Sequence, residues 1–455
     1  MKRNRFMWLL CAVSLTAVGC SGEKTEPAGA TTAEPTAEAV EAPAEAPKPE
    51  AGKGFDLEKK VVTLGALNDE SGPAATIGKP YAVGKRILVA QVNAGGTDIL
   101  PEGWKIEMVE KDHSYNPQKS VQAYNQVKDE VALILTSFGT PNTLPLRAHL
   151  ERDEVIALPA SLSSQMAAHK FTPPAGPSYK VEAQRVMDHI VEQAGEGGAA
   201  KIKAGIVYQQ DDYGKDGLEG WQASAKMHGV EIVSEQTVTP GQRDFTAVIT
   251  GLKDKGATHV LLTVLPSATG PILANAAQLQ YGPQFIGQTP TWIDGFFNPK
   301  VIPSAVFGNY SLASAQPYWG EERPGMDKFL AAFKAHGGEA TPDGYILMSY
   351  IQGMFGLEAV KRAIEAGEPN RAGVLKALQS IDKWNAGGLV QPISANTFPY
   401  VAGTETRILK PDFEKKSWTV VADFASPKES AGAAAAPTAA APAADAPAAD
   451  APAAE

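Results

Sequence analysis

Over about 370 residues, from Phe55 to Phe424, short apolar runs alternate with segments in which apolar residues recur every three or four positions. Short apolar runs bounded by turn residues are typical of buried strands, and the longer spacing is typical of helices. Strands that alternate with helices form parallel sheets covered by helices on both faces. The chain is therefore predicted to be an α/β protein with doubly wound sheets. Because a single hydrophobic core stops growing at roughly 250–300 residues, two domains are expected.

The alternation falls into two series, each of which can form one sheet. We expect strands at 61–67, 106–109, 131–135 and 155–158 in the first series, with helices at 81–92, 118–127 and 144–150. We expect strands at 204–208, 231–237, 259–263 and 284–286 in the second, with helices at 182–193, 217–227, 245–255 and 271–280. Three later helices, at 326–335, 345–366 and 374–381, are expected to pack on the first sheet. Two such sheets side by side would form a cleft at the carboxyl ends of their strands.

The first twenty residues have the pattern of an export signal. Lys2, Arg3 and Arg5 precede an uncharged apolar run, 6–18, that is too short to span a bilayer durably. The following Ala-Val-Gly-Cys resembles the signal of bacterial lipoproteins, in which the cysteine is acylated and the peptide is cleaved before it. We therefore expect residues 1–19 to be a signal peptide and Cys20 to carry a lipid that anchors the protein in the cell envelope. An ordinary secreted protein cut nearby is the alternative.

Both ends of the expected mature chain have the composition of unfolded segments. Residues 20–54 are mostly Ala, Pro, Glu, Thr and Gly, and residues 425–455 end in three copies of Ala-Pro-Ala-Ala-acid. Such segments bury too little apolar surface to offset the entropy of ordering them. We interpret the first as a spacer between the lipid and the folded core, and the second as a solvated acidic tail.

Charge and motif content narrow the classes of function. The formal net charge of −10 becomes −13 once the three basic residues of the signal are removed, which argues against a nucleic-acid partner. Cys11 is lost with the signal, so no disulfide is expected. Neither a Gly-x-x-x-x-Gly-Lys-Ser/Thr phosphate loop nor a Gly-x-Ser-x-Gly turn occurs, and the seven histidines lack metal-ligand spacing. We therefore expect a protein that is not an enzyme and that needs no cofactor or metal.

Four motifs follow one another along the core. They are the loop 65–78 around Ser71-Gly72-Pro73, the segment Asp212-Tyr213-Gly214, the segment 241–252 around Asp244-Phe245, and Gln284-Phe285-Ile286-Gly287. In order and spacing they resemble the branched-chain amino acid (Leu/Ile/Val) binding proteins of ABC importers, over about four fifths of the chain. The resemblance implies two lobes that are joined by three crossings and close over a small solute. It also implies a monomer whose partner is an ABC permease in the inner membrane.

The resemblance further implies lobe boundaries and binding residues. Lobe 1 is expected to comprise 55–181 and 310–390, and lobe 2 is expected to comprise 182–309 and 391–424. Hydroxyl and backbone N–H groups at two strand ends are expected to bind a ligand carboxylate, although helix capping by the serines is the alternative. The residues at these ends are Ser137 and Phe138, then Ala160, Ser161 and Leu162. Tyr213 is expected to cover the ligand from the second lobe, and the remaining lining positions are Ile77, Leu265 and Tyr345.

The ammonium position departs from the family. Thr289 stands where the family has the acid that binds the ligand's ammonium group. A buried ammonium without a carboxylate partner is costly, so either Asp294 substitutes or the ligand lacks an α-ammonium group. The expected ligand is therefore a small amino acid or a related carboxylate or amide, which the protein delivers to an ABC importer. A ligand-sensing receptor of the same fold, or an exported enzyme, is the alternative.

Overall fold

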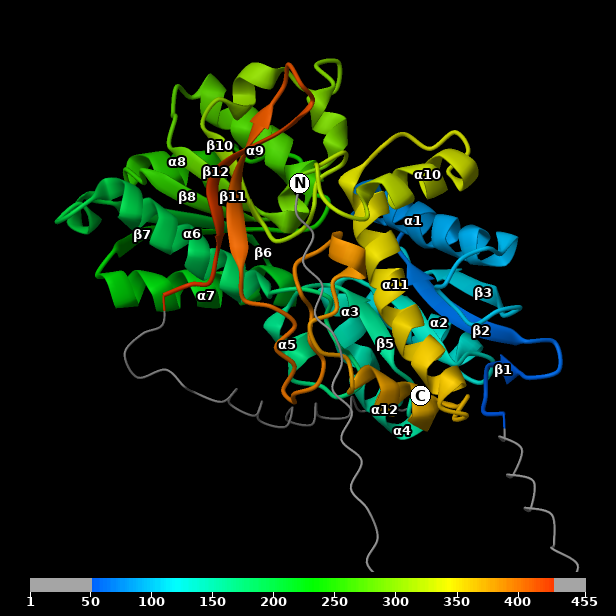
Figure 1. Ribbon diagram of the computed structural model, residues 1–455. Coiled ribbons are helices and arrows are strands. Elements are labelled where there is room, and N and C mark those ends of the chain that lie inside the picture. Colours follow the sequence, from blue (N-terminus) through cyan, green and yellow to red (C-terminus); the bar gives the residue numbers. More distant parts are fainter. Residues whose placement is uncertain (1–50, 429–455) are drawn as a thin grey trace, which may run out of the picture. The chain divides into compact units, whose positions relative to one another are not determined.

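The computed structural model describes residues 51–428 (Figure 1). The predictions for the signal peptide, for Cys20, for most of the spacer and for the tail from residue 429 onward lie outside these residues. Within them, the chain forms two sheets. No described helix is both long enough and apolar enough to cross a membrane.

The first sheet is built around β2, which pairs in parallel with both β3 and β4. Its other contacts are the parallel pairing of β4 with β5 and the antiparallel pairing of β1 with β2. All six residues of β4 are buried, as expected for a strand covered on both faces. The strands are β1 (Phe55–Asp56), β2 (Val61–Asn68), β3 (Lys105–Asp112), β4 (Leu133–Phe138) and β5 (Ala157–Ala160).

Helices from two distant parts of the sequence cover the first sheet. The early helices are α1 (Ala75–Ala94), α2 (Pro117–Val127), α3 (Thr140–Thr143), α4 (Arg147–Asp153) and α5 (Ser164–Ala167). The late ones are α10 (Met326–His336), α11 (Gly344–Glu365) and α12 (Arg371–Leu378), and α11 packs between α1 and α12 (Figure 1). The apolar side chains of these late helices join the core of the first sheet, which confirms the prediction that they return to it.

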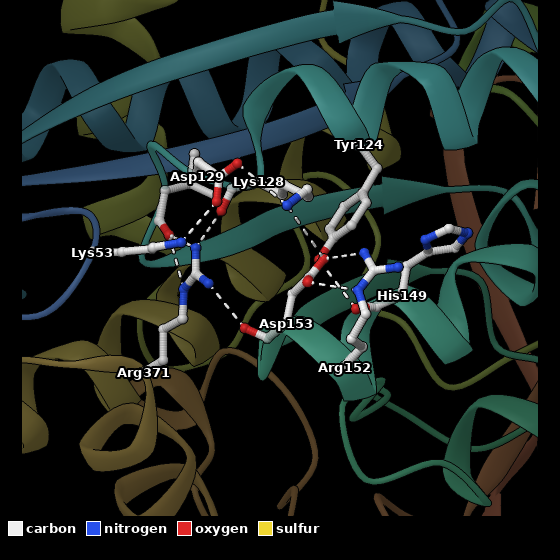
Figure 2. Close-up of polar contacts among 9 residues, drawn as sticks. Lys53, Tyr124, Lys128, Asp129, His149, Arg152, Asp153 and Arg371 are labelled. Atoms are coloured by element: carbon white, nitrogen blue, oxygen red, sulfur yellow. Dashed lines mark hydrogen bonds and ion pairs between the residues drawn. The ribbon is translucent and has the colours of Figure 1, made fainter.

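Arg371 ties the start of α12 to the ends of two early helices. Its guanidinium group donates hydrogen bonds to the carbonyl oxygens of Val131 at 2.8 Å and Asp153 at 2.9 Å, and also to that of Lys128 (Figure 2). Carbonyl groups beyond a helix end lack intrahelical donors, so one arginine satisfies several of them at once. These hydrogen bonds join parts of the first lobe that lie more than 200 positions apart in the sequence.

The second sheet has seven strands in the order β12-β11-β10-β9-β8-β6-β7. The five from β7 to β10 are parallel, and β11 and β12 add an antiparallel edge. The strands are β6 (Lys203–Gln209), β7 (Glu231–Val238), β8 (His259–Thr263), β9 (Gln284–Gln288), β10 (Tyr310–Ser314), β11 (Thr406–Asp412) and β12 (Ser417–Ala425). The accompanying helices are α6 (Tyr179–Ala194), α7 (Asp212–His228), α8 (Thr246–Asp254) and α9 (Pro266–Gln278), and separate apolar clusters fill the two faces.

The chain passes three times between the sheets, after β5, after β10 and before β11. The fold is therefore the predicted pair of doubly wound parallel sheets. Two of the expected lobe boundaries differ in the structure. The strand β10, which the sequence analysis placed in lobe 1, pairs with β9 because its apolar residues are buried in the second sheet. Ile393, Ala395 and Tyr400, which were placed in lobe 2, pack into the first core, so the last crossing follows them.

Candidate functional site

A cavity lies where the carboxyl ends of strands from both sheets meet. Eight of the eleven residues predicted to bind ligand line it: Ile77, Phe138, Ala160, Ser161, Tyr213, Leu265, Thr289 and Tyr345. Seven further lining residues were not predicted: Tyr81, Tyr115, Gly139, Thr140, Tyr179, Pro290 and Met348. The geometry therefore brings most of the expected residues to one cavity, and the unpredicted residues add three tyrosines.

Topology explains why these residues meet. Phe138 ends β4 and Ala160 ends β5, while Tyr213, Leu265 and Thr289 directly follow or soon follow β6, β8 and β9. In doubly wound sheets, side chains at the carboxyl ends of parallel strands share one edge. Two such edges contribute to the cavity, and the start of α11 contributes Tyr345.

Two motif glycines allow the helices that carry the lining residues to start close to a strand. A Cβ atom on Gly78 would lie 1.7 Å from the carbonyl oxygen of Asp69, and one on Gly214 would lie 1.9 Å from that of Gln209. Neither position has room for any side chain. The Asp211 side chain caps α7 by accepting hydrogen bonds from the backbone N–H groups of Tyr213 and Gly214, both at 3.1 Å. These contacts fix Tyr213 at the cavity.

Six of the fifteen residues that line the cavity are aromatic. The ring of Phe138 packs edge-to-face with Tyr81, and Tyr179 packs edge-to-face with Tyr213 at a centroid distance of 4.7 Å. Burial raises the pKa of Tyr81, Tyr179 and Tyr213 above the usual value, so all three hydroxyls remain neutral at physiological pH. The wall therefore offers apolar ring faces and neutral hydroxyl groups.

Hydrogen bonds connect elements of the two sheets around the cavity. The Tyr345 hydroxyl of α11 donates to the carbonyl oxygen of Thr289, at 2.9 Å. The amide of Gln209, at the end of β6, donates to the Tyr115 hydroxyl at 3.4 Å. Tyr115 follows β3 much as Phe138 ends β4, so the strand-end rule applied to β3 would have found it.

Ser161 places a hydroxyl group at the cavity wall. Its hydroxyl lies 2.6 Å from the Thr140 hydroxyl, and both residues line the cavity. The predicted alternative, helix capping by Ser137 or Ser161, is wrong, because Gly139 and Ser163 occupy the capping positions there. One hydroxyl of the pair donates to the other, and the accepting hydroxyl can donate its own proton to an anionic oxygen.

Three predicted residues do not line this cavity. The Ser137 side chain is fully buried and its hydroxyl lies 2.8 Å from that of Thr143, because the side chain points toward α3. Leu162 packs in one apolar cluster with Tyr179 and Tyr213. Asp294 lies on an adjoining cavity. Side-chain direction, which the sequence does not encode locally, separates these residues from the eight that converge.

The adjoining cavity shares part of its wall with the first. Thr289, Tyr345 and Met348 belong to both cavities, and Trp292 and Trp418 are among the apolar residues of the second. The shared wall makes the two cavities neighbours across the Tyr345–Thr289 contact.

Two carboxyl groups meet beside the adjoining cavity. Asp294 accepts a hydrogen bond from the backbone N–H of Gly344 at 2.9 Å, and its own backbone N–H donates to Asp343 at 3.3 Å. Burial raises the pKa of both carboxyl groups, and the charge of Asp294 raises that of Asp343 further. Asp294 therefore serves as a partner of the α11 terminus in this structure.

Thr289 is held from behind by a buried acid that the sequence analysis missed. The carboxyl group of Glu182, in the first turn of α6, accepts hydrogen bonds from the Thr289 hydroxyl at 2.5 Å and from its backbone N–H at 3.2 Å. Burial raises the pKa of Glu182 to about 8, with a further contribution from the charge of Asp216. Among residues 51–428, no group of His, Cys, Asp and Glu side chains could hold a metal ion.

Sequence comparison assigns most of the core to one family. The family model described as periplasmic binding protein matches residues 61–398. An amino acid binding protein of Pseudomonas aeruginosa is 23% identical over 316 residues, covering 68% of this chain and 81% of that protein. The Leu/Ile/Val-binding protein homolog 8 of Brucella abortus is 24% identical over 354 residues, covering 72% and 83% respectively.

Solved structures share the fold. A fatty acid ABC transporter substrate-binding protein from Thermomonospora curvata matches with a TM-score of 0.76 at 22% identity, covering 83% of this chain and 95% of that one. A branched-chain amino acid ABC transporter structure from Thermus thermophilus with bound valine matches with a TM-score of 0.72 at 18% identity, covering 81% and 97%. The family indicated by the sequence motifs is confirmed, and the chain belongs to the periplasmic binding protein family.

Proposed function

We propose that this protein is an extracytoplasmic solute-binding lipoprotein that captures a small amino acid, or a related carboxylate or amide, and delivers it to an ABC importer. The observation that carries the proposal is one cavity whose wall comes from both sheets and includes eight residues that the sequence motifs predict to bind ligand. Relatives named for amino acids or for leucine, isoleucine and valine support the same ligand class. Ligand capture would account for the cavity without any catalytic group.

The cavity wall suits a ligand with one polar end and one apolar end. The hydroxyl pair of Thr140 and Ser161 would bind the carboxylate or amide oxygen, because the hydroxyl that accepts within the pair keeps its own proton to donate to the ligand. Ring faces such as those of Phe138 and Tyr213 would receive the apolar side chain. Closure of the lobes over the ligand would form the contacts of Tyr345 with Thr289 and of Gln209 with Tyr115.

The anchor and the partner belong to the same proposal. Lipid on Cys20 would hold the protein at the envelope, residues 21–54 would act as the tether, and a monomeric core would dock on an inner-membrane permease. A sensor of the same fold would bind the same ligand but would not support its uptake. An exported enzyme would convert the bound compound, so recovery of unchanged ligand from the complex would exclude it.

A longer aliphatic carboxylate is a second candidate ligand. The cavity that adjoins the first across Thr289, Tyr345 and Met348 favours it, since a chain longer than a leucine side chain would extend along its apolar residues, such as Trp292 and Trp418. One structural neighbour is a substrate-binding protein named for fatty acids. Movement of the Tyr345 side chain would be required to join the two cavities.

The test is a thermal-shift screen followed by calorimetry on the purified protein. The panel contains amino acids, their carboxylate analogues lacking the amino group, amides and medium-chain fatty acids. A ligand at about a hundred times its Kd should add ~2.7 kcal/mol to the unfolding free energy. No stabilisation by any member of the panel would refute the proposed ligand class.

Two serine variants locate the binding site. Ser161→Ala should weaken binding of the identified ligand by ~1–3 kcal/mol, because a hydrogen bond to a charged oxygen is lost. Ser137→Ala is the matched control, since its hydroxyl is also paired with a threonine but does not reach the cavity. It should leave the Kd unchanged. Equal effects of the two substitutions on affinity would contradict the placement of the site.

A further inference from the structure

Glu182 is a buried acid that contacts Thr289, a residue of the cavity wall, but does not line the cavity itself. Its side chain has no exposed surface, and both of its hydrogen bonds recorded in the structure come from Thr289, which lines the cavity. Thr289 lies 107 positions later in the sequence and follows β9. The carboxyl group therefore acts on the cavity through one hydroxyl group.

The carboxyl group lacks a compensating positive charge. Among residues 51–428, no lysine, arginine or histidine nitrogen lies within 4.0 Å of its oxygens. The titratable groups around it are acids or phenols: Asp216 on α7 and the tyrosines Tyr179, Tyr213, Tyr310 and Tyr345 on four different elements. An isolated buried carboxylate is costly, which is why such groups take up a proton or bind a cation.

The charge of Glu182 determines what Thr289 can offer to the cavity. A threonine hydroxyl has one proton and two lone pairs. When the carboxylate is ionised, it receives that proton, as the 2.5 Å contact allows, and a lone pair of the hydroxyl oxygen is left to accept from an N–H group. When the carboxyl group is protonated, it can donate to Thr289, and the hydroxyl proton is then free for the Ser314 hydroxyl, 3.0 Å away, or for a group in the cavity.

We propose that Glu182 is the specificity-determining acid of this cavity: through Thr289 it provides the negative charge that balances the ammonium group of an α-amino acid ligand. The inference rests on the proposed function and narrows it to ligands with a positively charged nitrogen. It also assigns to α6 the charge that Asp294 was predicted to supply.

The proposal makes proton release the signature of amino-acid binding. Because the pKa of Glu182 is raised to about 8, about nine tenths of the free protein carries the proton at pH 7. A nearby ammonium group favours the ionised carboxylate and lowers that pKa. Binding should therefore release roughly 0.5–0.9 proton per ligand at pH 7, whereas a ligand without the amino group should release far less.

Calorimetry in two buffers of different ionisation enthalpy measures the released protons. The probes are L-leucine, L-isoleucine and L-valine, each paired with the carboxylate that lacks its amino group. Glu182→Gln should abolish proton release and weaken amino-acid binding by about 100-fold, while carboxylate binding changes by less than about threefold. Glu192→Gln, on the same helix but with a partly exposed side chain paired with Lys428, is the matched control and should behave as wild type.

A second variant keeps the test informative if Glu182→Gln does not fold. Thr289→Val retains the shape of the side chain but removes the hydroxyl link, and it should likewise reduce the preference for amino acids over carboxylates. Unchanged proton release in either variant would overturn the role of Glu182 and leave the proposed function intact. Tight binding of the carboxylates without binding of the amino acids would also overturn the role of Glu182 and leave the proposed function intact. No binding of any probe, amide or fatty acid would instead overturn the proposed function.

Discussion

Replacing Glu182 with glutamine should make the ligand-free protein more stable at neutral pH and less stable in acid. The folded protein raises the pKa of this carboxyl group from its usual 4.5 to about 8, because burial disfavours the charged form. A carboxyl group whose pKa is higher in the folded state contributes stability that is complete below its unfolded pKa. That contribution is lost as the pH rises from about 4.5 toward about 8.

The size of the effect follows from the pKa and the hydrogen bonds. Each pH unit in this window lowers the unfolding free energy of the wild type by about 1.4 kcal/mol. At pH 7 the wild type has therefore lost about 3 kcal/mol of stability that the Glu182→Gln variant keeps. Glutamine retains one acceptor for the Thr289 hydroxyl, but its NH₂ group faces the backbone N–H of Thr289 and loses that bond, at a cost of about 1 kcal/mol. Glu182→Gln should therefore stabilise by about 2 kcal/mol at pH 7 and destabilise by about 1 kcal/mol at pH 4.

Urea unfolding of both proteins between pH 4 and pH 8 measures the difference, and the two stability curves should cross at about pH 5. Glu192→Gln is a control of opposite sign. The pKa of Glu192 is lowered by Lys428 and Arg185 despite partial burial, so that variant should lose stability at neutral pH and regain wild-type stability in acid. Parallel curves for the wild type and Glu182→Gln would refute the reasoning, since they would mean that Glu182 titrates normally in the folded protein.

Three further predictions concern other parts of the chain. Cys20→Ser should release the exported protein from washed membranes, and equal membrane retention of the variant would contradict the lipid anchor. Arg371→Ala should lower the unfolding free energy by ~2–4 kcal/mol in urea titrations, with Arg371→Lys intermediate, because three carbonyl groups lose a charged donor. Asp294→Asn should change leucine affinity by less than about threefold at pH 7, since asparagine keeps the acceptor for Gly344. A loss of leucine affinity above about 100-fold in this variant would instead make Asp294 the ammonium partner.

The strand ends illustrate how far local sequence patterns reach. Phe138, Ala160 and Thr289 meet at one cavity because each stands at or next to the end of a buried apolar run, and parallel strands bring such ends together. The antiparallel strands β11 and β12 were missed, because Lys410 and Pro411 interrupt the short buried run of β11, and the edge strand β12 alternates poorly between buried and exposed positions. The pattern is strong where a strand is buried on both faces and weak at the edge of a sheet.

The sequence by itself determined the fold class, the family and the location of the cavity. These depend on periodicity, on the order of motifs and on the rule that strand ends converge, all of which can be read along the chain. Only the tertiary structure decided that Ser161 faces the cavity while Ser137 faces α3, because that choice depends on which neighbour each side chain packs against. It alone also brought Glu182 to Thr289, since a contact across 107 residues is made by the packing of α6 on the end of β9 and leaves no periodic signal in the sequence.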